Sequence, residues 1–440
     1  MSDPIPSPRY PAGGARAPTP LPPPGMPARR AALRLLDAVL RRGEPLETAL
    51  HGASQGIADR ADRALVHAIA AETLRRLPDL DALIDGATKQ RLPDDAKARM
   101  VLRIALVQAL SLGTPPHAAI STALPLVDGG PRKLVHGVFG TIMRAGTTLP
   151  QSATLPAEVE ARWRAQWGDA MVEAAALTLC VRPPVDLALR DPAETAHWAD
   201  TLSGVSLAPG HVRLGGHDAI PDLPGFADGA WWVQDIAASI PARLLGAGEG
   251  RHVLDLCAAP GGKTMQLAAA GWRVTALDLS QKRLERLSEN LARTGLGAET
   301  IAADLRAWAP AEPAAAVLLD APCSATGIYR RHPDVLYRIG DRQIAERAAL
   351  QAELIDRAGQ WVAPGGVLVY ATCSLERAEG EDQAAGFLAR NPGFRAISPD
   401  VRTLPEGVVA TPEGWVRTLP STLADSGGTD GFFIGRFRRD

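Results

Sequence analysis

Two cysteines stand in short motifs that each follow a predicted buried strand. Cys323 belongs to Asp320-Ala-Pro-Cys-Ser-Ala-Thr-Gly, and Cys373 belongs to Tyr370-Ala-Thr-Cys-Ser. A thiolate beside a methyl donor can add to C6 of a cytosine that has left its stack, which makes C5 nucleophilic enough to take the methyl group. A protonated or hydrogen-bonded ring N3 eases that addition, and Asp320 is suited to this task. We therefore expect Cys323, Cys373 and Asp320 to be catalytic, although chemistry alone does not say which thiol attacks.

The same region has the features of a nucleoside-cofactor site. The apolar run 252–256 leads into a loop of small residues, Cys257-Ala-Ala-Pro-Gly-Gly-Lys-Thr, where the backbone can approach a ligand closely. Acidic residues end three further strand-like runs, and ligands of open α/β sheets bind beyond the carboxyl ends of the strands. The residues expected to hold the cofactor are Cys257, Ala258, Ala259, Pro260, Gly261, Gly262, Lys263, Asp278, Asp304 and Asp320.

Cofactors with phosphate groups fit this loop poorly. A P-loop needs a glycine where Cys257 stands, Pro260 removes an N–H from the phosphate cradle, and a dinucleotide fold needs three spaced glycines. S-Adenosylmethionine instead carries a positive sulfonium, which several carboxylates would tolerate. We expect Asp278 to bind its ribose, Asp304 to lie near its adenine, and loop 257–263 to pass under its methionine part.

Strand-like and helical runs alternate from about residue 250, which predicts a doubly wound α/β sheet. A helical pattern covers Gln281–Arg293, and the apolar runs are 252–256, 273–278, 300–304, 315–320 and 366–372. A last strand-like run, 431–437, has no helix after it, so we expect that strand to be antiparallel. We assign residues 236–440 to this catalytic domain.

The first third of the chain has a different pattern. Residues 28–150 have apolar positions at helical spacing, which predicts an all-helical domain. Its expected helices begin at Arg29 and continue at 60–77, 80–89, 95–112, 117–127 and 133–144. Residues 1–27 contain 10 of the 37 prolines, so we expect a disordered leader. Residues 151–235 combine a helical run, 156–179, with short strand-like runs, which predicts a small α+β connector.

Charge is distributed unevenly along the chain. With 47 basic and 49 acidic residues the formal net charge is −2, which argues against a protein that coats nucleic acid by bulk charge. Residues 28–150, however, hold 17 basic and 12 acidic residues, so this part carries +5 and the rest −7. The four cysteines form no CxxC pair, so we expect no metal site, and Cys180 is expected to be ordinary core. We find no signal peptide or membrane span and expect a cytoplasmic monomer.

Three runs resemble motifs of the RNA cytosine-5 methyltransferase family: 255–264, 320–327 and 370–374. Val233-Gln-Asp235 and Asp430-Gly-Phe-Phe433 resemble the first and last segments of that family. The runs 60–64, 72–76 and 115–119 resemble the NusB-like RNA-binding domain that precedes the catalytic domain in one bacterial branch, although 135–140 departs from its pattern.

This resemblance implies a class I, Rossmann-like, seven-stranded methyltransferase domain that uses S-adenosylmethionine. It implies methylation of one cytidine in 16S ribosomal RNA, free or in early assembly. RNA members of the family attack with the cysteine that follows threonine, so the resemblance implies that Cys373 is the nucleophile and that Cys323 assists elimination. Two other functions stay open: a non-catalytic RNA-binding protein, and the same chemistry on transfer RNA.

Other candidate RNA contacts are less specific. Arg330 and Arg331 follow the Cys323 motif, and we expect them either to contact RNA beside the base pocket or to form a solvated pair. Four tryptophans could stack on bases, but we expect them to belong to the core or to a domain interface: Trp163, Trp167, Trp231 and Trp232.

Overall fold

The structure is a computed structural model that describes residues 25–215 and 219–440. Most of the predicted leader, 1–27, lies outside the described residues. The last residues of the predicted leader are described and are helical, because helix α1 (Met26–Arg42) begins at Met26, three residues before Arg29. Pro27 lies in the first turn of α1, where its fixed φ and its missing N–H are compatible with a helix.

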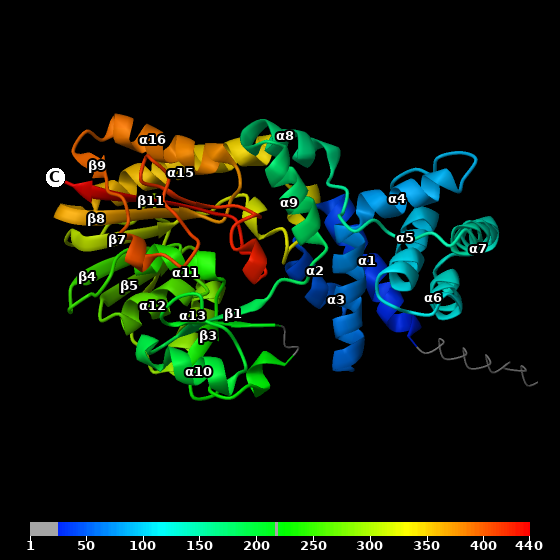
Figure 1. The fold of residues 1–440 in the computed structure, drawn as a ribbon, viewed down its shortest axis with the longest axis horizontal. Helices are drawn as coiled ribbons and strands as arrows, with labels where there is room; N and C mark the ends of the chain where they lie inside the picture. Colours follow the sequence, from blue (N-terminus) through cyan, green and yellow to red (C-terminus); the bar gives the residue numbers. More distant parts are fainter. Residues whose placement is uncertain (1–24, 216–218) are drawn as a thin grey trace, which may run out of the picture.

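The described N-terminal region is helical, as predicted, and lies at one end of the molecule (Figure 1). After α1 come α2 (Leu46–Ala53), α3 (Arg60–Arg75), α4 (Leu77–Gly86), α5 (Lys97–Leu110), α6 (Pro116–Ala123) and α7 (Gly129–Arg144). The sequence analysis missed α2. This helix has eight residues and buries three, Leu46, Ala49 and Ala53, which is too few for a helical repeat to stand out.

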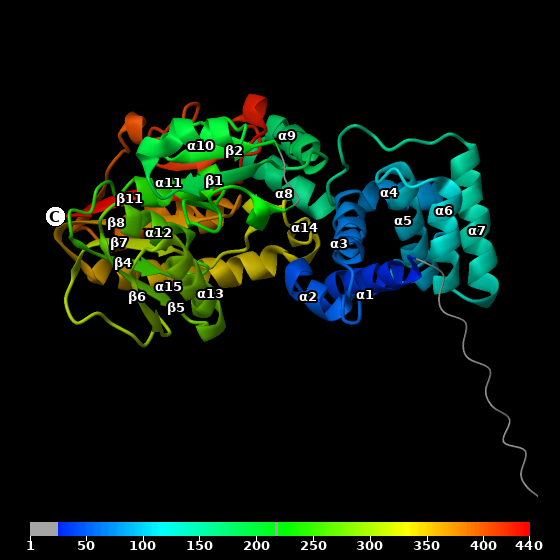
Figure 2. The same ribbon diagram turned by 90° about the horizontal axis from the view of Figure 1, so that it is seen from below.

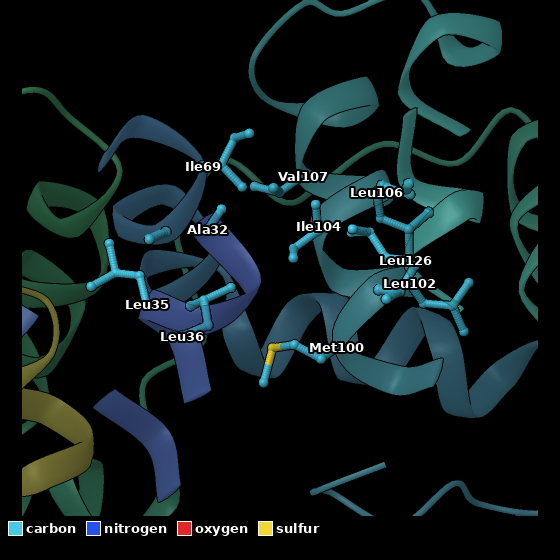
Figure 3. Close-up of a cluster of buried hydrophobic side chains, with 14 of the residues drawn as sticks. Ala32, Leu35, Leu36, Ile69, Met100, Leu102, Ile104, Leu106, Val107 and Leu126 are labelled. Carbon is cyan, nitrogen blue, oxygen red and sulfur yellow. The ribbon is translucent and has the colours of Figure 1, made fainter. Parts of the chain in front are cut away.

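Helix α5 is the centre of the helical region. Leu102, Ile104 and Leu106 from α5 pack with Leu35 and Leu36 from α1 and with side chains of the other helices (Figure 3). Almost every residue of α5 is buried. Apolar side chains therefore lie on nearly all faces of this helix, as expected of a helix that other helices enclose.

Two arginines of α5 are also buried, and each has a carboxylate partner. Arg103 donates two hydrogen bonds of 2.7 Å to Asp81. Arg99 is fully buried and pairs with Asp81 at 3.0 Å and with Asp85. Buried charges of this kind are tolerated because they are paired.

The segment that follows contains two helices where the sequence predicted one. Helix α8 (Ala157–Trp167) ends at Gly168, whose φ of 81° and ψ of 178° break the helix before α9 (Asp169–Leu179) begins. A three-stranded antiparallel sheet follows in the order β2-β1-β3. Its strands are β1 (Val185–Leu189), β2 (His211–Leu214) and β3 (Trp231–Val233), with α10 (Thr195–Thr201) between β1 and β2.

A larger sheet forms the rest of the molecule. Its order is β10-β11-β8-β7-β4-β5-β6, and β9 pairs with β11, so the sheet has eight strands rather than the expected seven. The strands are β4 (His252–Leu256), β5 (Arg273–Asp278), β6 (Glu299–Ala302), β7 (Ala314–Asp320), β8 (Val362–Thr372), β9 (Phe394–Ala396), β10 (Val416–Thr418) and β11 (Phe432–Arg439). The four pairings from β6 to β8 are parallel, whereas β11 is antiparallel to β8, as predicted.

Helices cover both faces of this sheet (Figure 2). Alternate residues of β7 face opposite ways: Leu318 packs in the cluster that contains α11, α12 and α13, and Leu319 packs in the cluster that contains α15 and α16. The central strand β7 is apolar along almost its whole length for this reason. The covering helices are α11 (Ile236–Arg243), α12 (Gly262–Ala269), α13 (Gln281–Thr294), α15 (Asp341–Gln360) and α16 (Glu381–Arg390).

The helical region contacts the segment that follows the Cys323 motif. Helix α14 (Val335–Arg338) lies against α1 and α2 (Figure 2), and Asp334 at its start accepts a hydrogen bond of 3.2 Å from the backbone N–H of Leu46. The Tyr337 hydroxyl donates to the carbonyl of Leu74 at 2.7 Å. The two regions are therefore joined next to the catalytic motif. Among helices of the described residues, none combines the length and hydropathy needed to cross a bilayer.

Candidate active site

The predicted site residues gather at the carboxyl ends of the central parallel strands. A cavity of about 470 Å³ lies there. Its walls include Asp320, which ends β7, and Cys373, which follows β8. The loop after β4 supplies Ala258, Ala259, Pro260, Gly262 and Lys263. The cavity thus lies where the sequence analysis expected a ligand, beyond the carboxyl ends of the parallel strands.

The two cysteines of the catalytic motifs are neighbours. Their sulfur atoms lie 3.4 Å apart, within hydrogen-bond distance, and both thiols are free and half-buried. The hydrogen bond with Cys373, together with burial, raises the pKa of Cys323 well above its usual value. Cys323 therefore keeps its proton at neutral pH, and its thiol is in hydrogen-bond contact with the sulfur of Cys373, which lines the cavity.

Asp320 is held by an ion pair inside the cavity. Its Oδ2 lies 2.7 Å from Nζ of Lys263, whose side chain is almost fully buried beside the Phe432 ring. Burial opposes the charge of Lys263, but the Asp320 carboxylate outweighs it and raises the pKa of the lysine. Lys263 therefore remains an ammonium group and fixes the carboxylate of Asp320 at the cavity wall.

The loop after β4 has a tightly constrained backbone. Cys257 has a φ of 62° and Gly261 a φ of 104°, in the left-handed region. A side chain at Gly261 would meet Cγ of Leu287 at 2.8 Å, so this position requires glycine. Burial raises the pKa of Cys257 to about 12, so its thiol contributes packing rather than reactivity.

Buried carboxylates anchor this loop from behind. Asp278, at the end of β5, accepts hydrogen bonds from the N–H groups of Ala259 at 3.2 Å and Ser280 at 2.9 Å. Asp255 is fully buried and accepts a 2.6 Å hydrogen bond from Thr264, and burial raises its pKa to about 7. The structure places Asp278 against the loop and does not include it in the cavity wall.

Asp304 is not brought to the cavity. It lies two residues beyond β6, the edge strand, where it pairs with Arg306 at 2.7 Å and accepts a hydrogen bond from the N–H of that residue. Hydrogen bonding to Arg306 lowers the pKa of Asp304 to about 2. The acid therefore stabilises a turn at the edge of the sheet. The neighbouring Ala303 donates to the carbonyl of Asp278 at 3.1 Å, but Asp304 itself does not line the cavity.

The two arginines after the Cys323 motif are not a solvated pair. Arg330 is buried and donates to the carbonyl of Gly427. Arg331 lines the cavity and pairs with Asp235 at 2.9 Å and with Asp430 at 3.2 Å. Sequence reasoning missed this role because the two acids lie about 100 residues away on either side.

The two cysteine motifs are tied together by a buried acid that the sequence analysis did not identify. Glu379 accepts hydrogen bonds from the N–H of Ser324 at 2.8 Å and from the hydroxyl of Ser374 at 2.5 Å. Ser324 follows Cys323, and Ser374 follows Cys373. Glu379 therefore sets the relative position of the two cysteine loops, and a lone glutamate in a helical run gave no signal of it.

Three of the four tryptophans are buried, as expected for the core: Trp163, Trp231 and Trp232. Trp167 is half-buried and donates to the carbonyl of Leu375 at 2.8 Å, while Arg377 and Arg417 lie over its ring. Cys180, expected to be plain core, is half-buried at the edge of the cluster around Trp163.

The sheet, the covering helices and the cavity at the strand ends define a protein with a Rossmann-like methyltransferase fold and an added helical region. Comparisons with solved structures support this fold class. A protein designated PH0851 aligns with a TM-score of 0.72 at 22% identity, covering 94% of this chain and 99% of that one. NSun6 from Pyrococcus horikoshii, solved with SFG, aligns with a TM-score of 0.56 at 20% identity, covering 64% and 98%.

Sequence relatives define the family. Residues 242–438 match the family described as 16S rRNA methyltransferase RsmB/F, and residues 26–144 match the NusB family. Ribosomal RNA small subunit methyltransferase B of Xanthomonas campestris pv. campestris is 37% identical over 395 residues, covering 83% of this chain and 88% of the relative. Its counterpart from Klebsiella pneumoniae subsp. pneumoniae is 36% identical over 396 residues, covering 83% and 90%. The chain therefore belongs to the RsmB/F family of rRNA methyltransferases, which confirms the resemblance and makes a non-catalytic role untenable.

Proposed function

We propose that this enzyme transfers a methyl group from S-adenosylmethionine to C5 of a cytidine in 16S ribosomal RNA through a covalent bond between Cys373 and C6. The observation that carries the proposal is the pair of sulfur atoms 3.4 Å apart beside the ion pair of Lys263 and Asp320. Methyl transfer to nitrogen needs no thiol, whereas C5 is a poor nucleophile until a thiolate has added to C6. The names of the sequence relatives support the small-subunit RNA as substrate.

Each side chain has a definite task in this proposal. The Cys373 sulfur attacks C6, and the protonated Cys323 hydrogen-bonds that sulfur and assists its departure at the end of the reaction. The carboxylate of Asp320, fixed by Lys263, accepts a hydrogen bond from N3 once that nitrogen has taken up the proton that the Cys373 thiol loses, and so stabilises the ring during addition. Because the target ring must enter the cavity, the cytidine has to leave its stack.

The residues of the cavity fit S-adenosylmethionine. The bound cofactor would supply an electrophilic methyl group on a positive sulfonium. Four carboxylates line the cavity, namely Asp186, Asp235, Asp320 and Asp430, against three basic side chains, Lys263, Arg293 and Arg331. The lining is therefore acidic by one charge, which suits a cation better than a phosphate. Loop 257–263 would support the methionine part, and Asp278 behind it would take the ribose. The expected contact of Asp304 with adenine remains a prediction that its pairing with Arg306 does not favour.

The proposal also gives the helical region a place in RNA binding. A second cavity, of about 1030 Å³, lies between α3 and the end of α9, and its walls include Arg60, Arg63 and Arg75. Glu72 also lines it, so basic side chains predominate. Arginines in a hollow of this kind suit the phosphate backbone of RNA.

Methyl transfer to defined RNAs tests the proposal. The purified enzyme is incubated with labelled S-adenosylmethionine and either 16S rRNA or transfer RNA, and the methylated nucleoside is identified by mass spectrometry. We expect 5-methylcytidine in 16S rRNA at a single position. Transfer to transfer RNA alone, or a product methylated on nitrogen, would contradict the proposal.

A further inference from the structure

One carboxylate of the cavity has an oxygen without a partner. Asp430 lines the cavity and is 3% exposed. Its Oδ2 pairs with Arg331 at 3.2 Å, but its Oδ1 is buried and accepts no hydrogen bond from any described residue. An unsatisfied buried carboxylate oxygen is costly, so a site that retains one calls for an explanation.

The backbone places Asp430 beside the attacking cysteine. The N–H of Gly431 donates to the carbonyl of Gly327 at 2.9 Å, and the N–H of Gly327 donates to the carbonyl of Cys373 at 3.0 Å. Asp430 also lies two residues before Phe432, which lines the same cavity and contacts Lys263. The segment before β11 therefore faces the same space as the thiol that attacks C6.

Two of the other three cavity carboxylates have both oxygens committed to hydrogen bonds. Both oxygens of Asp186 accept hydrogen bonds from Arg213, at 2.7 and 2.8 Å. In Asp235, Oδ2 pairs with Arg331 and Oδ1 accepts from Thr429 at 2.9 Å. Asp320 is held by Lys263 and serves ring addition in the proposed function. Cys323 remains a protonated thiol, which suits an acid rather than a base.

Resting on the proposed function, we propose that Asp430 is the base that removes the C5 proton after methyl transfer. The C5–H bond breaks, and its proton goes to Oδ1 of Asp430. The electron pair of that bond first forms a C4=C5 double bond, while the electrons of the C4=N bond return to the exocyclic nitrogen. The nitrogen pair then restores C4=N, the C4=C5 pair becomes the C5=C6 double bond, and the C6–S bond breaks with its electrons on the Cys373 sulfur. Cys323 hydrogen-bonds the departing sulfur, so product release needs no other reactant.

The surroundings of Asp430 suit this task. Burial and the neighbouring charge of Asp235 raise its pKa to about 7, while Arg331 and Arg330 act in the opposite direction. A base is most effective when its pKa lies near the working pH, because it is then both ionised and able to hold the proton.

A double-label experiment tests this inference. The enzyme is incubated with 16S rRNA carrying [5-³H]cytidine and with ¹⁴C-methyl S-adenosylmethionine, and tritium release is compared with methyl incorporation. The wild type is expected to release one tritium per methyl group. Asp430→Asn is expected to transfer the methyl group but to retain both the tritium and the covalent bond, with tritium release reduced about 10²-fold or more. Asp430→Glu restores part of the release.

Two further variants make the result specific. Asp425→Asn removes an exposed acid from the same segment and is expected to keep the wild-type ratio. Cys323→Ala is expected to accumulate an adduct that has already lost its tritium, because its defect lies in sulfur departure. Wild-type tritium release per methyl in Asp430→Asn, or loss of adduct formation in that variant while it remains folded, would overturn the inference.

Two outcomes separate the inference from the proposed function and from misfolding. A wild type that methylates RNA without releasing tritium would overturn the proposed C5 chemistry itself. If Asp430→Asn does not fold, the wild type decides: the ratio of adduct to free product is expected to rise as pH falls below about 7. A ratio that stays flat from about pH 5 to 9 would overturn the role of Asp430.

Discussion

The helical region and the catalytic cavity both bury charged side chains, but they balance them differently. In the helical core, Arg99 and Arg103 meet Asp81 and Asp85, two cations with two anions. In the cavity, the single guanidinium of Arg331 is shared by Asp235 and Asp430. Balanced pairs hold a structure together, whereas burial beside a second acid raises the pKa of Asp430 to about 7, so that this carboxylate can exchange protons. The first region is built for stability and the second for chemistry.

The largest effect should come from removing a thiol of the cavity rather than a thiol elsewhere. Cys373→Ala is expected to lower methyl transfer by at least about 10³-fold, because C5 loses its activation. Cys180→Ala, at the edge of the core, is expected to leave the rate near that of the wild type. Initial rates with labelled cofactor and 16S rRNA measure both, and equal losses in the two variants would remove the distinction between the regions.

Breaking a balanced pair should affect stability and not chemistry. Arg103→Met leaves Asp81 without its hydrogen-bonded partner, and we expect the free energy of unfolding to fall by about 3 kcal/mol. Arg91→Met, in an exposed pair with Asp94, should cost less than about 1 kcal/mol. Urea unfolding gives both values. If Arg103→Met also lowered the methyl-transfer rate per folded molecule substantially, the helical core could not be assigned to stability alone.

The buried acid Asp255, which anchors the loop behind the cavity, should make stability depend on pH. The pKa of Asp255 is about 7 in the folded protein, above the value of about 4 for an unfolded chain. The folded state therefore holds this proton more tightly than the unfolded state does. The resulting gain in folding stability is complete below about pH 4 and is lost as pH rises to about 7. Thr264, Lys263, Asp320 and Asp278 are the groups that face it.

Replacing Asp255 with Asn should remove this dependence. Relative to the wild type, Asp255→Asn is expected to gain stability as pH rises from 4 to 7, by up to about 1.4 kcal/mol per pH unit. Asp341→Asn, an exposed acid, serves as the control. Unfolding midpoints at pH 5 and pH 8 check the expectation, which fails if the difference between Asp255→Asn and the wild type is the same at both values.

The smallest effect concerns the basic hollow of the helical region. Arg60→Gln removes one exposed guanidinium and should weaken RNA binding a few-fold while lowering the salt dependence by about one unit. Titration of 16S rRNA at several salt concentrations gives the slope. Lys89→Gln, which lies outside this hollow, should leave that slope unchanged, and an equal change in both variants would argue against a defined RNA path.

The site was predictable from sequence where it depended on strand ends and local motifs. The loop after β4, Asp320, Cys323 and Cys373 all follow central strands, so their meeting at one edge of the sheet could be expected. Asp304 follows the edge strand β6, which has four residues, and pairs with Arg306 there without lining the cavity. Its expected place near adenine stays a prediction.

What the sequence could not reveal were contacts between distant acids and arginines. Arg331 reads as a surface residue, yet Asp235 and Asp430 draw it into the cavity wall. Glu379 reads as part of a solvated face, yet it joins the two cysteine loops. Such pairings depend on tertiary structure, because a buried charge is stable only when a specific partner meets it. Helix α2 was missed for a local reason, since eight residues carry too short a repeat.

The most direct test of the central claim is to locate the covalent bond to RNA. Cys323→Ala is incubated with S-adenosylmethionine and 16S rRNA, resolved on a denaturing gel, and the RNA-linked peptide is identified by mass spectrometry. We predict a stable adduct on Cys373 in Cys323→Ala and no adduct in Cys373→Ala. An adduct on Cys323 in the Cys373→Ala enzyme would reverse the two roles and contradict the account.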